Sequence, residues 1–274
     1  MVEDTYTEGA SPAMKPYDIF LVAAPKDFGK LPVMLKGLTA NLIGYEQIHL
    51  CTPKKIPPEF YDPIAKYPIH YHLDKDVLQY DINSIRYRPP WHYQQFLKLF
   101  QKVTPNEYYY TCDCDVMLLQ NLKLWRGDQP VWHYGWPQSS TEYYRFIKEM
   151  LGVDLVPRHT WLADMNFFSH KYIDEMVASK FDSVDAFLKK AQEIITIDCR
   201  CSEADLYMQY MMTNHPEVYI EKQLRLKAIG KNCADAEAQI FGVEQIRKEI
   251  DLARTEGMQA VALHSWNDLQ QYPW

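Results

Sequence analysis

The chain has 274 residues, of which 47% are hydrophobic and 24% charged, a composition typical of folded domains that excludes a largely disordered protein. The net charge of -7 argues against nucleic acid as the main partner, because nucleic-acid-binding proteins usually have an excess of basic residues. Aromatic residues make up 14% of the chain, which suits stacking on sugars or bases as well as packing in a core.

The sequence shows no sign of a membrane span or of export. No apolar run approaches the roughly 20 residues that a membrane helix needs. Residues 1–16 are acidic and polar, without the apolar middle of a signal peptide, and we expect them to form a flexible tail. The six cysteines are too few for a disulfide scaffold in a chain of this length. We therefore expect reduced thiols and a soluble, cytoplasmic protein.

The first half of the chain alternates predicted strands and helices. Residues 18–24 form an apolar run typical of a buried strand, and a turn follows it. Pro32 and the leucines after it at helical spacing predict a helix that ends at Gly44. Further strands are expected at 47–52 and 69–73. A strand, a helix and a strand with short connections are typical of a parallel sheet covered by helices.

The same alternation continues to the end of the chain. A proline pair begins a helix at Pro89, and the aromatic run 107–112 predicts a strand that is followed by another at 116–119. Further strands are expected at 131–134, 161–169 and 260–263. Further helices are expected at 141–151, 171–178, 184–195, 203–213 and 243–255. We predict a single compact α/β domain over 17–274, with a nucleotide-binding half (17–120) and an acceptor-binding half (121–274).

Two aspartates separated by one cysteine follow the strand predicted at 107–112. Residues i and i+2 of an extended segment point to the same side, so Asp113 and Asp115 can face one site. Two carboxylates at the end of a buried strand are costly without a compensating cation, and oxygen ligands of this kind suit Mg²⁺ or Mn²⁺. Open α/β sheets bind ligands beyond the carboxyl ends of their strands, which is where this pair lies. Taken alone, the triplet is equally compatible with a solvated acidic turn.

The strand and helix order, together with residues 108–119 (YYYTCDCDVMLL), resembles the GT-A glycosyltransferases from about residue 17 onward. In that fold the nucleotide-binding half ends in an Asp-x-Asp motif that holds the metal and the sugar-nucleotide diphosphate. Residues 91–98 (WHYQQFLK) and 201–207 (CSEADLY) look most like soluble enzymes of bacterial-capsule and chlorovirus-type glycosylation. The resemblance implies a Rossmann-like GT-A sheet, mostly parallel and flanked by helices. Because the sequence shows no membrane span, we expect a bacterial cytoplasm, or the host cytoplasm if the protein is viral.

The resemblance implies a metal shell and a nucleotide site. Asp115 would be the direct metal ligand, Asp113 would bind the ribose or a metal-bound water, and His264, after the last predicted strand, would complete the shell. Asp74 would contact a uracil ring. The other residues expected at the nucleotide are Ala23, Ala24, Pro25, Lys26, Gln94, Gln95 and Lys98. A solvated helix face explains the last three equally well.

Two carboxylates are candidates for the base that takes the proton from the acceptor hydroxyl. Ser202 is a predicted N-cap and Asp205 completes an acidic capping box, so Asp205 is expected to be structural. Glu203 is thereby left free in the first turn and is the first candidate base. Alternatively, its negative charge only stabilises the N-terminus of the helix through the helix dipole. Asp164 interrupts an apolar stretch and is the second candidate. By resemblance, Asp164 and Asn166 would contact hydroxyls of the donor sugar.

An aromatic segment is a candidate platform for the acceptor sugar. Trp132, Tyr134 and Trp136 lie close together in the sequence, and aromatic rings stack on the apolar faces of pyranoses. Some of these rings are also expected to pack in the core.

The sequence therefore predicts a metal-dependent glycosyltransferase that moves a sugar from a UDP-sugar to a glycan hydroxyl, with inversion and a β-linkage. If no carboxylate lies behind the anomeric carbon, a retaining mechanism is the alternative. Xylose or another small sugar would suit a pocket lined by large rings. A sugar nucleotidyltransferase is the second hypothesis. Such enzymes usually have a glycine-rich loop after the first strand, and the single glycine of this loop, Gly29, weakens the hypothesis. The third, a non-catalytic glycan-binding module, leaves the acidic triplet unexplained. The partners would be a nucleotide sugar and a glycan acceptor; the oligomeric state stays open.

Overall fold

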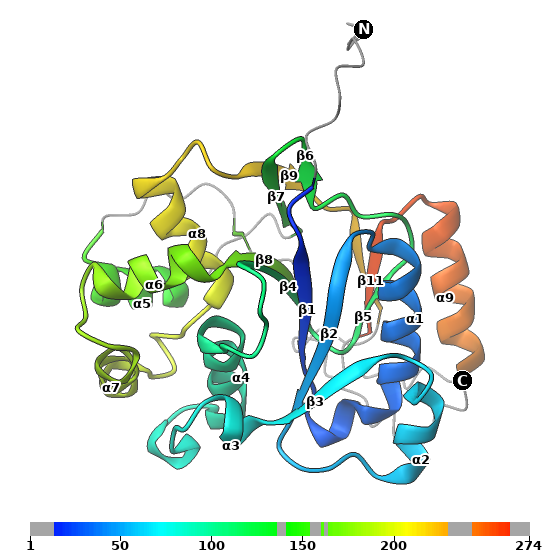
Figure 1. Cartoon of the computed structure of the whole chain (residues 1–274), viewed down its shortest axis with the longest axis horizontal. Coiled ribbons are helices and arrows are strands. Elements are labelled where there is room, and N and C mark those ends of the chain that lie inside the picture. Colours follow the sequence, from blue (N-terminus) through cyan, green and yellow to red (C-terminus); the bar gives the residue numbers. More distant parts are fainter. Residues whose placement is uncertain (1–13, 136–140, 154–159, 162–163, 230–242, 264–274) are drawn as a thin grey trace, which may run out of the picture.

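The computed structural model describes residues 14–135, 141–153, 160–161, 164–229 and 243–263. Its largest sheet has the strand order β3 (Ile69–Leu73), β2 (Tyr45–Thr52), β1 (Tyr17–Val22), β4 (Tyr108–Cys112) and β8 (Met165–Ser169). The first four strands are parallel, and β8 is antiparallel to β4 (Figure 1). The carboxyl ends of β1 and β4 therefore lie at the same edge of the sheet.

Two smaller sheets complete the β-structure. One has the order β10 (Leu226–Ile229), β11 (Ala260–Leu263) and β5 (Val116–Leu118); the other has the order β6 (Trp125–Arg126), β7 (Gln129–Tyr134) and β9 (Ile220–Gln223). Because β5 pairs with β11, the last described strand lies beside the acidic triplet. The Leu263 amide donates to the Asp115 carbonyl oxygen over 2.6 Å.

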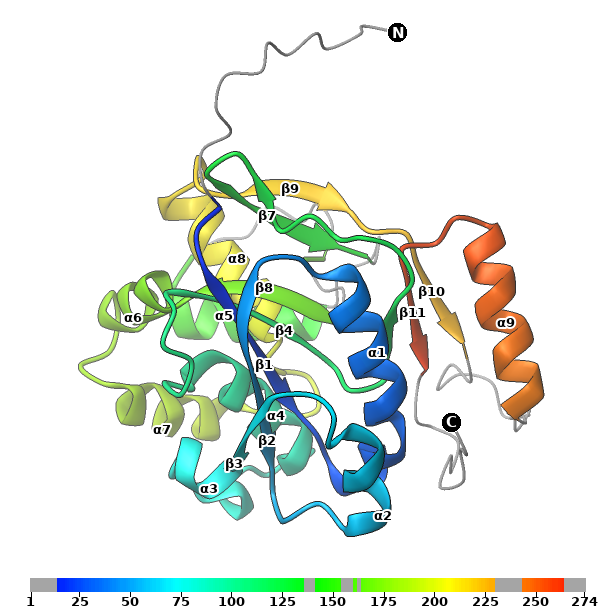
Figure 2. The same cartoon turned by 45° about the vertical axis from the view of Figure 1, so that its right-hand side comes forward.

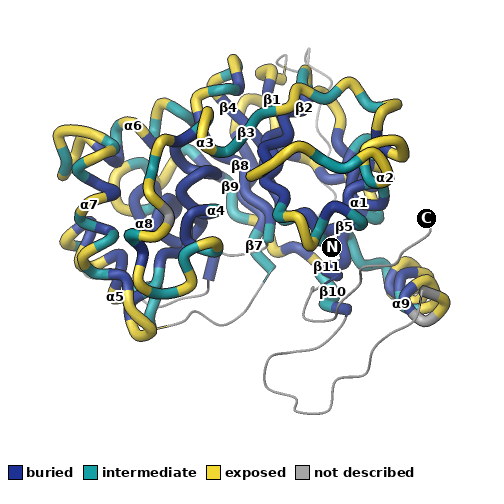
Figure 3. Tube along the Cα trace, turned by 90° about the horizontal axis from the view of Figure 1, so that it is seen from below, coloured by how far each residue is buried: buried dark blue, intermediate teal, exposed yellow. Residues whose placement is uncertain are grey.

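The helices lie on both sides of the largest sheet. Helices α1 (Leu31–Asn41), α2 (Pro58–Tyr61) and α9 (Val243–Thr255) lie on one side. The other side has α3 (Asp74–Val77), α4 (Pro89–Phe100), α5 (Thr141–Leu151), α6 (His170–Ala178), α7 (Val184–Ile194) and α8 (Glu203–Asn214). Buried residues concentrate in the strands and the helix faces turned toward them (Figure 3). No helix in these described ranges is both long enough and apolar enough to span a membrane.

Most elements predicted from hydrophobic patterns are present, but one strand begins later than predicted and several short elements were not predicted. The strand predicted at 161–169 begins only at Met165, because Asp164 has a left-handed backbone with φ of 53°. Strands β9 and β10 were not predicted, because their half-exposed residues alternate too weakly to mark a strand. The five described cysteines form no disulfide with one another in the structure.

The close approach of α1 to β5 depends on a glycine. A Cβ atom added at Gly37 would lie 2.9 Å from the Leu118 carbonyl oxygen and 3.0 Å from the Leu118 nitrogen. We expect Gly37→Ala to lower the melting temperature, although alanine in a helix interior normally stabilises by about 0.5–1 kcal/mol relative to glycine. Thermal unfolding followed by circular dichroism checks this. Ala40→Gly, at an exposed position of α1, measures helix propensity alone, and a stabilised Gly37→Ala protein would contradict the close contact.

Candidate active site

A cavity of about 310 Å³ opens where β1 and β4 end. Residues from both strand ends, α4, α5, β8 and the start of α8 line it. The lining includes Val22, Lys26, Asp27, Arg88, Trp91, Gln94, Gln95, Lys98, Asp113, Cys114, Asp115, Tyr143, Asp164, Asn166 and Glu203. The fold thus gathers most of the predicted site residues in one place, as expected for ligand sites in α/β proteins.

Lys98 connects two carboxylates in this cavity. Its ammonium group donates to Asp113 Oδ1 over 2.5 Å and to Glu203 Oε1 over 2.9 Å, and the residue is only 1% exposed. Burial by itself would lower the pKa of Lys98, but the two carboxylates outweigh it and raise the pKa above its ordinary value. Gln94 also donates to Asp113 Oδ1, over 3.0 Å. Lys98 therefore remains a cation and fixes both carboxylates.

Glu203 accepts hydrogen bonds from several donors, mostly at its Oε1 atom. Besides Lys98, Asn166 Nδ2 donates to its Oε1 over 3.1 Å. The Gln95 amide lies against the same carboxylate and donates to Oε1 over 2.8 Å when its NH₂ group faces that oxygen. Glu203 is 2% exposed at the first residue of α8, where the helix N-terminus also favours negative charge. These contacts fix the orientation of its carboxylate.

Asp164 has a different environment from Glu203. Its Oδ2 atom is buried without a hydrogen-bond partner among the described residues, and its φ of 53° is unusual for a residue other than glycine. Burial raises the pKa of Asp164 well above its ordinary value, and the nearby Asp113 and Asp115 raise it further. The Asp113 amide donates to the Asp164 carbonyl oxygen over 2.8 Å, which ties this strained residue to the end of β4.

Asp115 has only a distant basic neighbour among the described residues. Lys30 Nζ is 3.8 Å from its Oδ2 atom and is also held by Asp27 Oδ1 at 3.0 Å and by the Leu263 carbonyl oxygen at 3.1 Å. Burial and the adjacent Asp113 raise the pKa of Asp115 to about 7. Sequence patterns gave no indication that Lys30, far earlier in the chain, would lie here.

The lining has more acidic than basic side chains. Five carboxylates (Asp27, Asp113, Asp115, Asp164 and Glu203) face three basic groups (Lys26, Arg88 and Lys98). The described ranges contain no group of three or more His, Cys, Asp or Glu side chains arranged to hold a metal. Mg²⁺ is commonly held by one or two carboxylates together with substrate phosphates, so the acidic excess and the pair Asp113 and Asp115 fit such an ion. The third predicted ligand, His264, lies outside the described residues.

Some residues predicted for the nucleotide do not line the cavity. Ala23 is buried at the end of β1, and neither Ala24 nor Pro25 lines the cavity. Asp74 begins α3, where its carboxylate accepts a hydrogen bond from the Lys75 amide over 2.6 Å. Of the nucleotide contacts predicted at residues 23–26 and at Asp74, only Lys26 is in the described lining of the cavity.

Two aromatic residues of the lining were missed by sequence analysis as site residues. Trp91 and Tyr143 have nearly parallel rings, with centroids 6.3 Å apart and planes at 21°. The Arg88 guanidinium lies 5.0 Å from the Trp91 ring centroid, and its φ of 46° is left-handed. The sequence could have indicated Trp91, because it lies in the first turn of α4, the helix that also has the predicted site residues Gln94 and Gln95.

The prediction that Trp132 belongs to an acceptor platform is wrong. Trp132 has no exposed surface, packs against Tyr207 and donates from Nε1 to the Trp161 carbonyl oxygen over 3.0 Å. Tyr134 is half-buried against the core, and Trp136 lies outside the described residues.

The structural role predicted for Asp205 is confirmed. The Asp205 amide donates to Ser202 Oγ over 3.2 Å, which makes Ser202 the N-cap of α8. The Asp205 carboxylate accepts from the Trp161 amide over 2.7 Å and from Thr160 Oγ1 over 2.9 Å. These bonds hold the start of α8, and with it Glu203, against the segment at 160–161.

Solved structures are similar in fold to this chain. An active-site mutant of LgtC has a TM-score of 0.50 and 13% identity, over 89% of this chain and 86% of that chain. The chain has the GT-A fold. The galactosyltransferase LgtC with donor and acceptor sugar analogues has a TM-score of 0.48 and 14% identity, over 77% of this chain and 75% of that chain. Mouse xyloside xylosyltransferase 1 in its apo form has a TM-score of 0.46 and 9% identity, over 91% of this chain and 98% of that chain. No family model and no curated protein matches the sequence.

Proposed function

We propose that this chain is a metal-dependent glycosyltransferase that moves a sugar from a UDP-sugar to a hydroxyl of a glycan acceptor. The observation that carries this proposal is the acidic cavity at the ends of β1 and β4, in which Asp113, Asp115, Asp164 and Glu203 meet. The GT-A fold supports it, because the cavity occupies the edge of the sheet at which α/β proteins bind nucleotides. We propose a small donor sugar such as xylose, because large aromatic rings line the cavity.

Asp113 and Asp115 are the residues that would hold Mn²⁺ or Mg²⁺. Such an ion would supply Lewis-acid stabilisation of the diphosphate leaving group. Lys98 fixes the orientation of Asp113, and Lys30 lies behind Asp115, so both carboxylates are positioned before any ligand binds. Lys26 and Arg88 line the same cavity and would attract the anionic donor.

The geometry favours Asp164 over Glu203 as the catalytic base. A base needs a free oxygen within reach of the acceptor hydroxyl. Lys98 and Asn166 both donate to Glu203 Oε1, and the reoriented Gln95 amide lies against its Oε2. In contrast, Asp164 Oδ2 has no donor in the described part of the chain. Asp164 would take the proton as the hydroxyl attacks the anomeric carbon, with inversion and a β-linked product. Glu203 would orient the sugar through its fixed carboxylate, together with Asn166.

Binding of the donor can be tested without knowing the acceptor. We expect UDP and the matching UDP-sugar to raise the melting temperature by about 5 °C with Mn²⁺ when the ligand is near a hundredfold above its Kd, and much less with EDTA. UDP-xylose belongs in the panel. Asp115→Asn should abolish the Mn²⁺-dependent part of the shift, because it removes a ligand oxygen and its charge.

The matched control is Asp174→Asn, at an exposed aspartate paired with Lys102 on the surface. It should keep the full shift. Release of UDP from the stabilising donor would support a glycosyltransferase, and pyrophosphate chemistry would support a nucleotidyltransferase. A protein that Mn²⁺ and UDP stabilise no more together than separately contradicts the proposal.

A further inference from the structure

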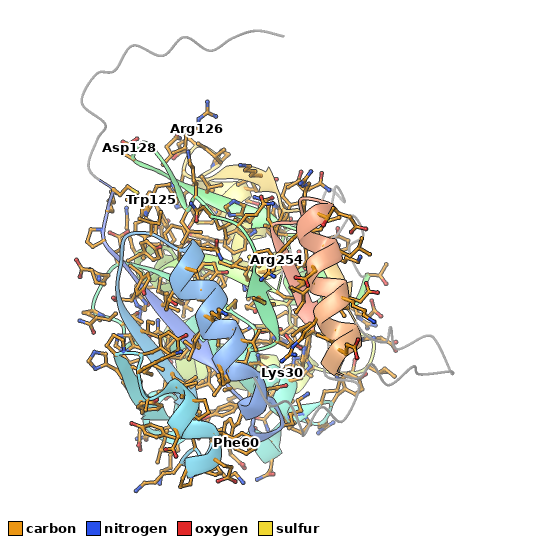
Figure 4. All side chains as sticks on the ribbon, turned by 90° about the vertical axis from the view of Figure 1, so that its right-hand side faces the viewer. Lys30, Phe60, Trp125, Arg126, Asp128 and Arg254 are labelled. Atoms are coloured by element: carbon orange, nitrogen blue, oxygen red, sulfur yellow. The ribbon has the colours of Figure 1, made fainter. Side chains whose placement is uncertain are left out.

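A second cavity, of about 650 Å³, lies between α1 and α9, away from the acidic cavity. Figure 2 shows both helices beside β10 and β11, and Figure 4 looks onto the two helices with Arg254 between them. The walls of this second cavity have four basic side chains: Lys36 on α1, Lys66 near α2, and Arg247 and Arg254 on α9. We call this cavity the basic groove.

The charge of the basic groove is opposite to that of the chain as a whole. The chain has a net charge of -7, yet the only acidic residue in the described lining of the groove is Asp251, which pairs with Arg254 at 2.9 Å. Lys36 forms no ion pair with a described residue, and Lys66 lies over the Tyr67 ring at 5.2 Å from its centroid. Four basic side chains thus face a single carboxylate in the described lining, and Lys36 adds positive charge that no described carboxylate pairs with.

The floor of the groove is apolar. Val33 of α1, Met117 of β5 and Ile250 of α9 are buried in one cluster beneath it, and the half-buried Tyr67 ring forms part of a wall. Small-molecule sites are typically cavities of about 300–1,000 Å³ with an apolar lining and a few convergent polar groups. The basic groove has this size and an apolar floor with convergent basic groups, although its lining has more polar than apolar surface.

We propose that the basic groove binds a small soluble ligand that has two or more phosphoryl groups and an apolar or ring-shaped part. The cations come from three separate segments around one cavity, so several anionic groups on one ligand can be neutralised together. Tyr67 and the floor would contact the rest of the ligand. A long polyanion such as nucleic acid is disfavoured, because the net charge of -7 repels a chain that extends beyond the groove.

Two segments of chain connect the groove to the acidic cavity. Lys30, which contacts Asp115 and the Leu263 carbonyl oxygen, immediately precedes α1, and Met117 follows Asp115 closely in the chain. A ligand in the groove would thus contact elements that also hold the candidate metal ligands. The binding proposal stands on the groove alone and does not need the glycosyltransferase proposal.

Calorimetric titration of the full chain with inorganic tripolyphosphate, in EDTA, tests the proposal. EDTA removes the metal that the acidic cavity would need, so binding there does not contribute. We expect one binding site per chain. Lys36→Glu and Arg254→Glu, on opposite walls, should each weaken binding by about tenfold or more. Lys248→Glu is the matched control, because Lys248 lies on the same helix, is exposed and does not line the groove.

Three outcomes would overturn the proposal. The first is no binding of tripolyphosphate by a chain whose circular dichroism shows it to be folded. The second is an equal loss in all three variants, which would indicate general charge attraction only. The third is binding to vesicles of phosphatidylglycerol without binding to tripolyphosphate, which would make the groove a membrane contact. None of these outcomes depends on whether the chain releases UDP from a UDP-sugar.

Discussion

Replacing Asp164 by asparagine should lower kcat for sugar transfer by at least about a hundredfold, since general-base catalysis typically contributes about 10²–10⁴-fold. Asparagine has nearly the shape of aspartate and tolerates the left-handed φ of 53°, so the backbone at the end of β4 should remain in place. The variant loses only the oxygen that can accept a proton. Initial rates of UDP release with the stabilising donor measure the effect.

Binding of UDP and Mn²⁺ separates catalysis from folding in this experiment. Asp164→Asn should bind both with nearly unchanged affinity, because Asp164 is not one of the two proposed metal ligands. Glu203→Gln is the comparison variant, and we expect it to change KM as well as kcat through the orientation of the donor sugar. If Asp164→Asn keeps its kcat while Glu203→Gln loses activity, Glu203 is the base, and the proposal that Asp164 is the base is wrong.

The second large effect concerns stability. Lys98→Met should lower the free energy of unfolding by about 3–5 kcal/mol, because it leaves the buried Glu203 and the adjacent Asp113 without their cation. Urea unfolding at neutral pH measures this loss. Lys102→Met, just beyond the end of α4, breaks an exposed ion pair with Asp174 and should cost less than about 1 kcal/mol.

A double variant distinguishes the ion pair from lost packing. In Lys98→Met with Glu203→Gln, one of the two unpaired carboxylates is neutral, so part of the lost stability should return. If the double variant is as unstable as the sum of the two single variants, the charge interaction contributes nothing measurable. The loss would then be assigned to the packing of the Lys98 side chain.

Local patterns were sufficient for the order of the main elements. The apolar run at 18–24 and the leucines after Pro32 correspond to β1 and α1, and residues 141–151 form α5 as expected. The capping box at Ser202 was also visible, because its two partners are close together in the chain. In contrast, β9 is short and only partly buried, so its pairing with β7 decides its conformation.

The sequence by itself determined the α/β alternation, the acidic pair Asp113 and Asp115 and the capped start of α8, because each depends on residues close together in the chain. Only the tertiary structure decided which carboxylates are paired. Lys98 and Glu203 are 105 positions apart, and their contact exists only because α4 and α8 pack on the same face of the sheet. The burial of Trp132 was likewise decided by packing, since an aromatic ring has the same apolar surface whether it meets a sugar or a core.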